Sequence, residues 1–343
     1  AVLAGPNFAD PLLGYAKYID VDSWIDHHLL TEMTKNIDGY RLSTFLFKDR
    51  GGKLTMGPIW DYNLTLGNAD CLQGWLPQGW YYPQLSAEEY PWWPRLFQDE
   101  AFRVRYADRW FSLRETVFAT SHMLADIDAH AAVLAESQVR NFVRWPILGT
   151  YVWPNAPGWA QRDTYEEEVD WMKNWLVNRL AWIDTQFVAP PVFNQDGGSV
   201  PYGFQLTMTP PAGTTGTIYY TLDGSDPYFA ETTALTLVAV SVGARTALPY
   251  TGPITLTDSA HVKARLHTST TWGALNEAIF TVGELALYIN EFMADNDAVL
   301  EDPDEPGEYP DWIEIHNPMT STAFLGGMYL TDLLSNPTKW QIP

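Results

Sequence analysis

Apolar residues recur at helical spacing in three long segments of the first half of the chain. Residues 20–36 place apolar side chains on one face, with Asp20 or Asp22 positioned to cap the helix start. Residues 162–187 repeat apolar positions at intervals of three and four, and acids crowd the first turns, where the helix dipole favours them. Residues 101–139 also carry a helical pattern. This half is therefore predicted to be mainly helical.

A β-hairpin is predicted between the first two helices. The strand-like runs 43–48 and 53–60 are separated by the turn sequence DRGG, 49–52. Asp38 lies in the polar loop before the hairpin, and Asp61 follows the returning strand. Because a hairpin folds back on itself, its outer ends are neighbours. Asp38 and Asp61 are therefore predicted to face one small volume.

The second half alternates polar and apolar residues. Short strand-like runs rich in Thr, Val and Tyr, including TALTLVAVSV at 233–242, are separated by turn signals over residues 192–282, which is typical of an immunoglobulin-like β-sandwich. The last segment holds twelve Asp or Glu against one Lys, and it includes further strand-like runs. The predicted domains are 1–188, 189–283 and 284–343.

Composition fits this multidomain α+β organisation and excludes several functions. The chain has 343 residues, of which 46% are hydrophobic, so it can build more than one core. Its net charge of −22 argues against binding to nucleic acid or to anionic lipid. No run is long enough to cross a bilayer. The single cysteine, Cys71, excludes an intrachain disulfide.

Two carboxylates at the mouth of a hairpin, after a helix, match the layout by which protein kinases hold Mg-ATP. One Asp orients the accepting hydroxyl, and the other binds the metal that bridges the phosphates. In that scheme a metal-binding Asn lies five positions after the catalytic Asp; Ser43 stands there in this chain, and it is a weaker ligand. The structural alternatives are a turn-forming Asp61 and an Asx turn at Asp38.

The stretch NIDGYRLSTFLFKDRGGKLTMGPIWDYNLTLGN closely resembles the CotH (spore-coat protein H) family of atypical protein kinases. The shared features are the NxD-type loop, the hairpin and a WDxDxxxG-like signature, and the resemblance covers about residues 7–188. It implies that Asp38 is the catalytic Asp and Asp61 the magnesium-binding Asp, with Mg²⁺ and ATP as cofactors. Asn63 stands where family members commonly carry a second metal-binding Asp, so it is a cofactor-binding candidate beside Ser43.

The resemblance places residues 1–188 in a kinase C-lobe. No GxGxxG or VAIK-like segment precedes Asp38, and the chain starts without Met, so we expect the N-terminal lobe and any signal peptide to lie outside this sequence. The chain by itself is therefore expected to be inactive. Incubation with Mg-ATP and casein tests this, and robust phosphate transfer would refute it.

The later segments also resemble known modules. IYYTLDGSDP, ITLTDSAHVKARL and AIFTVG are similar to the β-sandwich at the C-terminus of chitobiases and hexosaminidases, and INEFMADN, DWIEIHNP and LGGMYLTD are similar to a lamin-tail domain, here truncated. In bacteria such modules imply an extracellular or cell-surface protein. Two functions follow: a kinase that phosphorylates Ser or Thr of a surface protein, or a non-catalytic surface or carbohydrate-associated scaffold with a degenerate kinase-like lobe.

Four other features have a structural interpretation as well as a functional one. Adjacent His27 and His28 point about 100° apart on a helix, so they are interpreted as surface residues rather than metal ligands. TLDGSDP, 221–227, is interpreted as a turn and not an acidic catalytic pair. The acidic run 295–305 is interpreted as a solvated loop rather than a Ca²⁺ site. The aromatic-rich 75–97 is equally consistent with internal packing and with a stacking surface.

Overall fold

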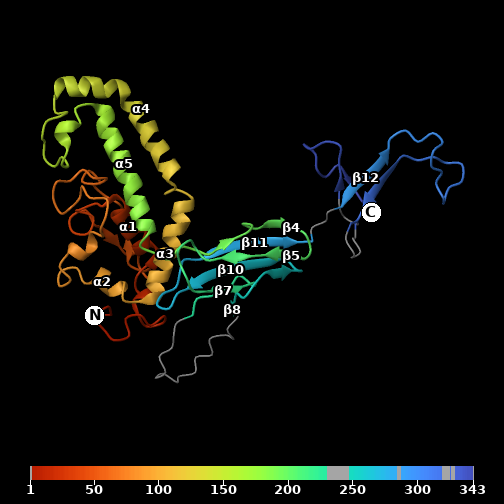
Figure 1. The fold of residues 1–343 in the computed structure, drawn as a ribbon, viewed down its shortest axis with the longest axis horizontal. Helices are drawn as coiled ribbons and strands as arrows, with labels where there is room; N and C mark the ends of the chain where they lie inside the picture. The colour runs from red at the N-terminus through yellow and green to blue at the C-terminus, as the bar shows by residue number, and fades with distance from the viewer. Residues whose placement is uncertain (1, 230–246, 284–286, 319–324, 326–328, 343) are drawn as a thin grey trace.

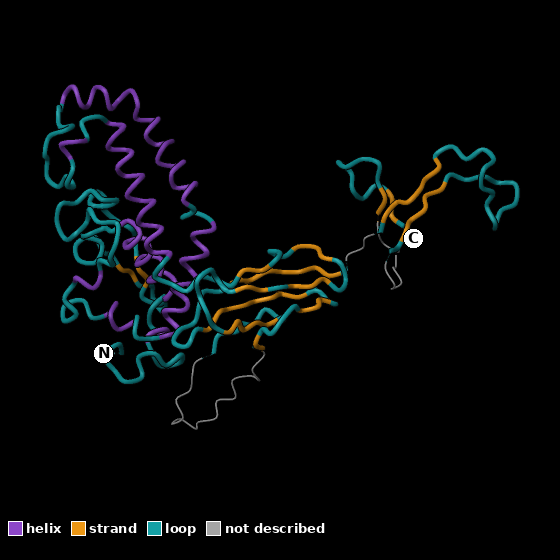
Figure 2. The backbone as a smooth tube through the Cα atoms, in the orientation of Figure 1, coloured by secondary structure: helices purple, strands orange, loops and turns teal. Residues whose placement is uncertain are grey.

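The structure is a computed structural model that describes residues 2–229, 247–283, 287–318, 325 and 329–342. Its first part is helical, and its later part consists of β-strands in several small sheets (Figure 1; Figure 2). The prediction of a multidomain α+β protein is therefore confirmed. The expected strand within residues 233–242 lies outside the described residues.

The helical lobe contains five α-helices and one short hairpin among its described residues. The α-helices are α1 (Val21–Thr34), α2 (Trp92–Leu96), α3 (Glu100–Glu115), α4 (Thr120–Arg144) and α5 (Tyr165–Asp184). The hairpin strands are β1 (Leu46–Phe47) and β2 (Thr55–Met56), and 3₁₀ turns lie at Tyr15–Lys17, Tyr82–Gln84 and Trp159–Gln161. The helices expected from the patterns at 20–36 and 162–187 are thus present.

The core of the lobe forms where α1, α3 and α5 meet. Ile25, Trp110 and Leu180, one from each helix, are buried in a single hydrophobic cluster. By contrast, no residue of α4 is buried, and α4 and α5 run side by side as a pair that projects from the lobe (Figure 1).

The helical segment predicted over residues 101–139 forms two helices, α3 and α4. α3 ends at Glu115, and the amide groups of Thr116 and Phe118 both donate to the carbonyl of Leu113. Phe118 packs in the lobe core beside Trp110. Burial of this ring turns the chain away from the axis of α3, and α4 then starts at Thr120. The apolar pattern does not reveal this break because it continues on both sides.

The central β domain is a sandwich around its own core. Its larger sheet has the order β4 (Gly198–Val200), β11 (Asn276–Val282), β10 (Ala260–His267), β7 (Thr217–Thr221) and β8 (Leu248–Pro249), antiparallel except for β4 with β11. Two short antiparallel pairs accompany it: β3 (Val192–Phe193) with β6 (Met208–Thr209), and β5 (Phe204–Leu206) with β9 (Ile254–Leu256). Residues from both groups share one buried cluster, including Leu206, Leu256, Val262 and Phe280.

One buried arginine joins this sandwich to the helical lobe. Arg265 on β10 is 1% exposed, and its guanidinium donates to the carboxylates of Asp108 on α3 and Asp226 at 2.6–2.7 Å. Burial alone would lower the pKa of the Arg265 guanidinium, but the two carboxylates raise it above its usual value. Asp108 also accepts the amide of Leu275. Asp226 belongs to the sequence interpreted as a turn, and its ion pair with Arg265 gives it a structural role.

The last described strands form two further ribbons. β12 (Tyr288–Met293) pairs with β13 (Trp312–His316), and β14 (Tyr329–Leu330) pairs with β15 (Trp340–Gln341), both antiparallel. The acidic loop between β12 and β13 is mostly exposed. Among the described residues, no group of three or more His, Cys, Asp or Glu is arranged to hold a metal ion. The lamin-tail resemblance of this segment stays a prediction.

Candidate functional site

The hairpin is held against the start of helix α1. The amide of Leu54 donates to the carbonyl of Tyr18, and the carbonyl of Leu54 accepts the amide of Asp20 and the indole Nε1 of Trp24. The Met56 amide donates to Ser23 Oγ. The returning strand is therefore fixed to the same helix whose C-terminal end leads to Asp38.

The hairpin strands are shorter than expected. Only Leu46 with Met56 and Phe47 with Thr55 are paired, so the strand predicted over 53–60 ends at Met56. Gly57 has a φ of 130°, and Pro58 has no amide hydrogen to donate to a ladder. Strand pairing therefore stops five residues before Asp61, and other contacts must place Asp61.

Asn36 connects the two aspartate loops. Its side chain is fully buried; Oδ1 accepts the amide of Asp38 at 3.1 Å, and Nδ2 donates to the carbonyl of Asp61 at 3.2 Å. Its own amide donates to the carbonyl of Thr31 at the end of α1. One side-chain amide thus brings the backbones of Asp38 and Asp61 to the same place. Asn36 is the Asn of the NxD-type loop but was not predicted to be a site residue, although Asn commonly accepts the amide two residues further on in an Asx turn.

The Asp38 side chain is 22% exposed and lies among polar groups. Arg41 Nη2 is 3.5 Å from Asp38 Oδ1, at the limit of a hydrogen bond. Partial burial and the carboxylates of Asp70 and Asp38 raise the pKa of the Cys71 thiol, which places these acids in one neighbourhood. Asp70 Oδ2 accepts the Tyr151 hydroxyl at 2.6 Å. Among the described residues, the ion pair of Asp38 is therefore this long contact with Arg41.

Asp61 is exposed and has a φ of 59°, in the left-handed region that non-glycine residues seldom adopt. Asp tolerates this region better than most residues, and the Asn36 hydrogen bond fixes its carbonyl. Strained backbone of this kind is often retained at functional sites. A simple turn residue would explain the φ value of Asp61. It would not explain the hydrogen bond that the buried Asn36 side chain donates to the Asp61 carbonyl.

The two cofactor-binding candidates differ in placement. Ser43 is 5% exposed, and its amide donates to the carbonyl of Asp38, so it lies beside Asp38 but within the fold. Asn63 is exposed and lines a separate cavity of about 370 Å³ that also involves Arg162 and Glu168. The roles of Asp38, Asp61, Ser43 and Asn63 in binding metal or nucleotide remain predictions.

A buried ion pair supports the loop that follows the site. Glu32 on α1 and Arg179 on α5 are both fully buried, 3.0 Å apart. The Glu32 carboxylate also accepts the amides of Tyr81 and Tyr82, and Arg179 donates to the carbonyls of Pro77 and Gly79. Burial raises the pKa of the Glu32 carboxyl, while Arg179 and these amides oppose the rise. The pair thus fixes an otherwise irregular segment against α1 and α5.

The prediction that His27 and His28 lie on the helix surface is wrong. His27 is 5% exposed, and His28 is fully buried inside a ring of aromatic side chains. Burial lowers the pKa of both imidazoles, so both are neutral near pH 7. The aromatic segment 75–97 supplies much of this packing. Tyr81 and Trp93 are 1% exposed, and Trp80, Tyr82, Trp92 and Phe97 pack partly buried against the core, which supports the packing interpretation for these aromatic residues.

Replacing Asn36 by Asp is expected to loosen the Asp61 loop more than the Asp38 loop. The carboxylate keeps an acceptor for the Asp38 amide but loses the donor to the Asp61 carbonyl, at a cost of about 1–3 kcal/mol of stability. Hydrogen–deuterium exchange should rise in residues 57–66. Asn68→Asp is the control, because Asn68 Nδ2 makes the same type of bond to the Asn63 carbonyl at an exposed position. Equal changes in both variants would contradict the role of Asn36.

Comparison with known proteins identifies two families. The family model described as CotH kinase protein matches residues 4–183, slightly more than half of the chain. A second model, described as Fn3 associated, matches residues 205–272, within the region expected to form a β-sandwich. No curated protein and no solved structure matches the chain. No helix of the described residues is long and apolar enough to span a membrane. From the match over its helical lobe, this chain belongs to the CotH kinase protein family.

Proposed function

We propose that this chain supplies the acid pair of an atypical protein kinase that transfers phosphate from Mg-ATP to a Ser or Thr hydroxyl of a surface protein. Asp38 orients the accepting hydroxyl, and Asp61 holds the magnesium ion. The proposal rests mainly on the Asn36 side chain, which ties the backbones of both aspartates through hydrogen bonds of 3.1 and 3.2 Å. Membership of a kinase family adds support.

The available donors suit magnesium. Mg²⁺ prefers oxygen ligands and is commonly held by one or two carboxylates, with waters and substrate phosphates completing the octahedron. Asp61, the residue proposed to hold the metal, is an exposed carboxylate of this kind. The metal would bridge phosphate oxygens and offset their negative charge. The acids themselves position the metal and the acceptor.

An exposed apolar surface on the hairpin side of the acid pair supports a nucleotide as the phosphate donor. Phe45 and Trp60 form an edge-to-face pair with ring centroids 6.1 Å apart, and they are 43% and 60% exposed. Ile59, beside Trp60, is 59% exposed. Large apolar patches next to polar groups commonly mark binding surfaces. A purine base stacked on this surface would have its phosphates within reach of Asp61.

A binding experiment on the chain tests the metal role. Mn²⁺, used in place of Mg²⁺ with ATP present, should bind the wild-type protein, and Asp61→Asn should weaken that binding by about tenfold or more through loss of a charged ligand. Asp49→Asn is the matched control, because Asp49 lies at the opposite end of the same hairpin. Water-proton relaxation reports the affinity. Equal affinities for wild type and Asp61→Asn would refute the proposal.

The alternative, a surface scaffold with a degenerate kinase-like lobe, is favoured by one observation. Ser43 stands where the kinase scheme has a metal-binding Asn, and its side chain is buried. Such a scaffold would bind neither Mn²⁺ nor ATP at the acid pair. Under either function we propose an extracellular or cell-surface location, based on the resemblance of the later segments to appended surface modules.

A further inference from the structure

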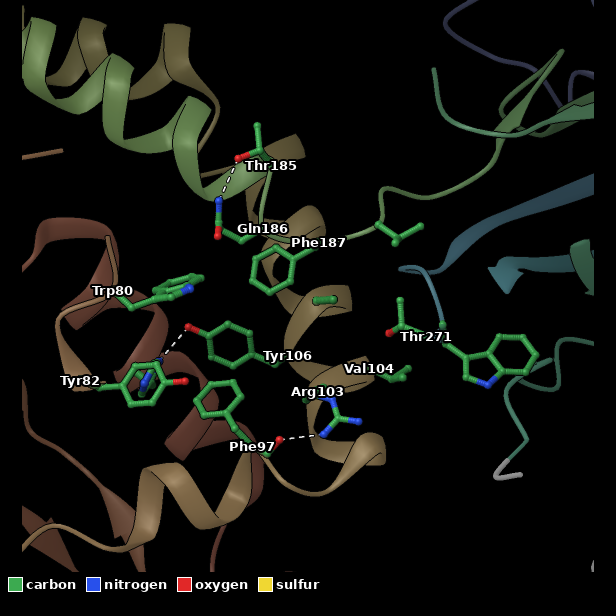
Figure 3. A pocket seen from close by; sticks show the side chains of 14 residues that line it. Trp80, Tyr82, Phe97, Arg103, Val104, Tyr106, Thr185, Gln186, Phe187 and Thr271 are labelled. Carbon is green, nitrogen blue, oxygen red and sulfur yellow. Dashed lines mark hydrogen bonds between the residues drawn. The ribbon is translucent and has the colours of Figure 1, made fainter. Parts of the chain in front are cut away.

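A cavity of about 350 Å³ lies at the seam between the helical lobe and the β-sandwich. α3, residues 185–188 directly after α5 and the segment around Trp80 line it from the lobe (Figure 3). Thr271 and Trp272 line it from the turn after β10. This volume is in the range of small-ligand pockets, which often form at domain boundaries. The candidate phosphotransfer residues Asp38 and Asp61 do not line it.

The walls of the cavity are aromatic and fixed by one another. Tyr82 stacks on Phe97 with ring centroids 5.1 Å apart, Phe97 packs edge-on against Tyr106, and Tyr106 contacts Phe187. The Tyr106 hydroxyl lies 2.8 Å from Nδ1 of buried His28, which holds the ring in place (Figure 3). Rigid aromatic walls favour a planar apolar ligand, because the side chains that line the cavity lose little conformational entropy when it binds.

Arg103 supplies the positive charge at this cavity. Among the described lining residues it is the one cation near pH 7, because burial lowers the pKa of His28 and keeps that ring neutral. One guanidinium nitrogen donates to the carbonyl of Phe97 at 2.7 Å, which orients the head group (Figure 3). Within the described chain, Arg103 has no carboxylate partner.

The missing partner is unusual for this helix. The other three arginines of α3 all pair with carboxylates: Arg105 with Asp22, Arg109 with Asp26 and Arg114 with Asp184. The chain has 42 acidic residues against 20 Lys and Arg, so acidic partners are abundant. An oriented but unpaired guanidinium at an aromatic cavity is suited to bind an anion from outside the chain.

We propose that this seam cavity binds a small aromatic carboxylate. The ring lies between the aromatic walls, and the carboxylate accepts hydrogen bonds from the Arg103 guanidinium. Gln186 and Thr271, which also line the cavity, offer polar groups for a ring substituent. Because both domains contribute walls, a bound ligand also stabilises their contact. The proposal does not depend on phosphotransfer at Asp38 and Asp61.

Isothermal titration calorimetry with 4-hydroxyphenylacetate and its neutral amide tests the proposal. The carboxylate should bind with a Kd of about 1 mM or tighter, which is reasonable for a ligand of this size. The amide should bind about 10- to 100-fold more weakly, because it lacks the charge-assisted bonds to Arg103. Arg103→Gln should remove this preference, and Arg105→Gln, two residues along the same helix, should retain it.

Filling the cavity provides an independent check. Ala107 is 5% exposed and lines the cavity, so Ala107→Met should exclude both ligands while leaving Arg103 in place. A melting curve establishes that each variant is folded before titration. The proposal is overturned if the folded wild-type protein binds neither compound at 5 mM, a concentration about fivefold above the expected Kd. It is also overturned if Arg103→Gln and Arg105→Gln behave alike.

Discussion

Arg179→Met is expected to destabilise the helical lobe by about 3–5 kcal/mol, because it leaves the fully buried Glu32 carboxylate without its cation. The same substitution removes the Arg179 guanidinium that donates to the carbonyls of Pro77 and Gly79. Such a loss is a large fraction of the stability of an ordinary domain. Urea denaturation followed by far-ultraviolet circular dichroism measures it.

The exposed pair Arg140–Glu136 provides the control for this prediction. Its side chains are 67% and 86% exposed on α4, so Arg140→Met should change the stability by less than about 1 kcal/mol. If Arg179→Met does not fold, the double variant Glu32→Gln, Arg179→Met should recover part of the loss by removing the unpaired charge. Equal effects of Arg179→Met and Arg140→Met would show that the buried pair contributes little.

In an active form of the protein, Asp38→Asn is expected to lower the kcat of phosphate transfer by about 10²- to 10⁴-fold, the usual contribution of a positioned acid–base group. In the proposed mechanism Asp38 contacts the acceptor hydroxyl and not the nucleotide. ATP affinity should therefore change little. Transfer of radiolabelled phosphate to casein measures the rate, and calorimetry measures ATP binding.

Asp49→Asn serves again as the control for a lost carboxylate on the hairpin. Full activity in this control together with a large loss in Asp38→Asn would assign the effect to the site. Two results would contradict the role of Asp38: retained activity in Asp38→Asn, or a loss of ATP binding that accounts for the whole decrease in rate.

The spacing of apolar residues predicted α1 and α5, two helices that form the core of the lobe. α1 and α5 lie within the segments where the three-and-four spacing indicated helices, because burial of one face determines both the spacing and the helix. The break between α3 and α4 was not predicted, since Phe118 turns inward without interrupting the apolar pattern. The CotH resemblance, drawn from residues 36–68, is confirmed by the family match.

The contacts that organise the lobe and its site were harder to foresee. Asn36, Arg179 and Arg265 are polar residues that are rarely buried, so a single sequence gives no reason to place them inside. Each has a partner far away along the chain: Asp61 lies 25 positions from Asn36, Glu32 lies 147 from Arg179, and Asp108 lies 157 from Arg265. The proximity of Asp38 and Asp61 was predicted from strand pairing, but in the structure it depends on the Asn36 amide.

The shared arginine at the seam bears on how the two halves of this protein have evolved. Arg265 neutralises one acid from each half, so a different sandwich grafted after residue 188 would leave Asp108 without its cation unless it carried an equivalent arginine. The helical lobe is therefore poorly suited to a following domain that lacks such an arginine. Recombination that reshuffles these modules should transfer the lobe and its sandwich together, as one inherited block.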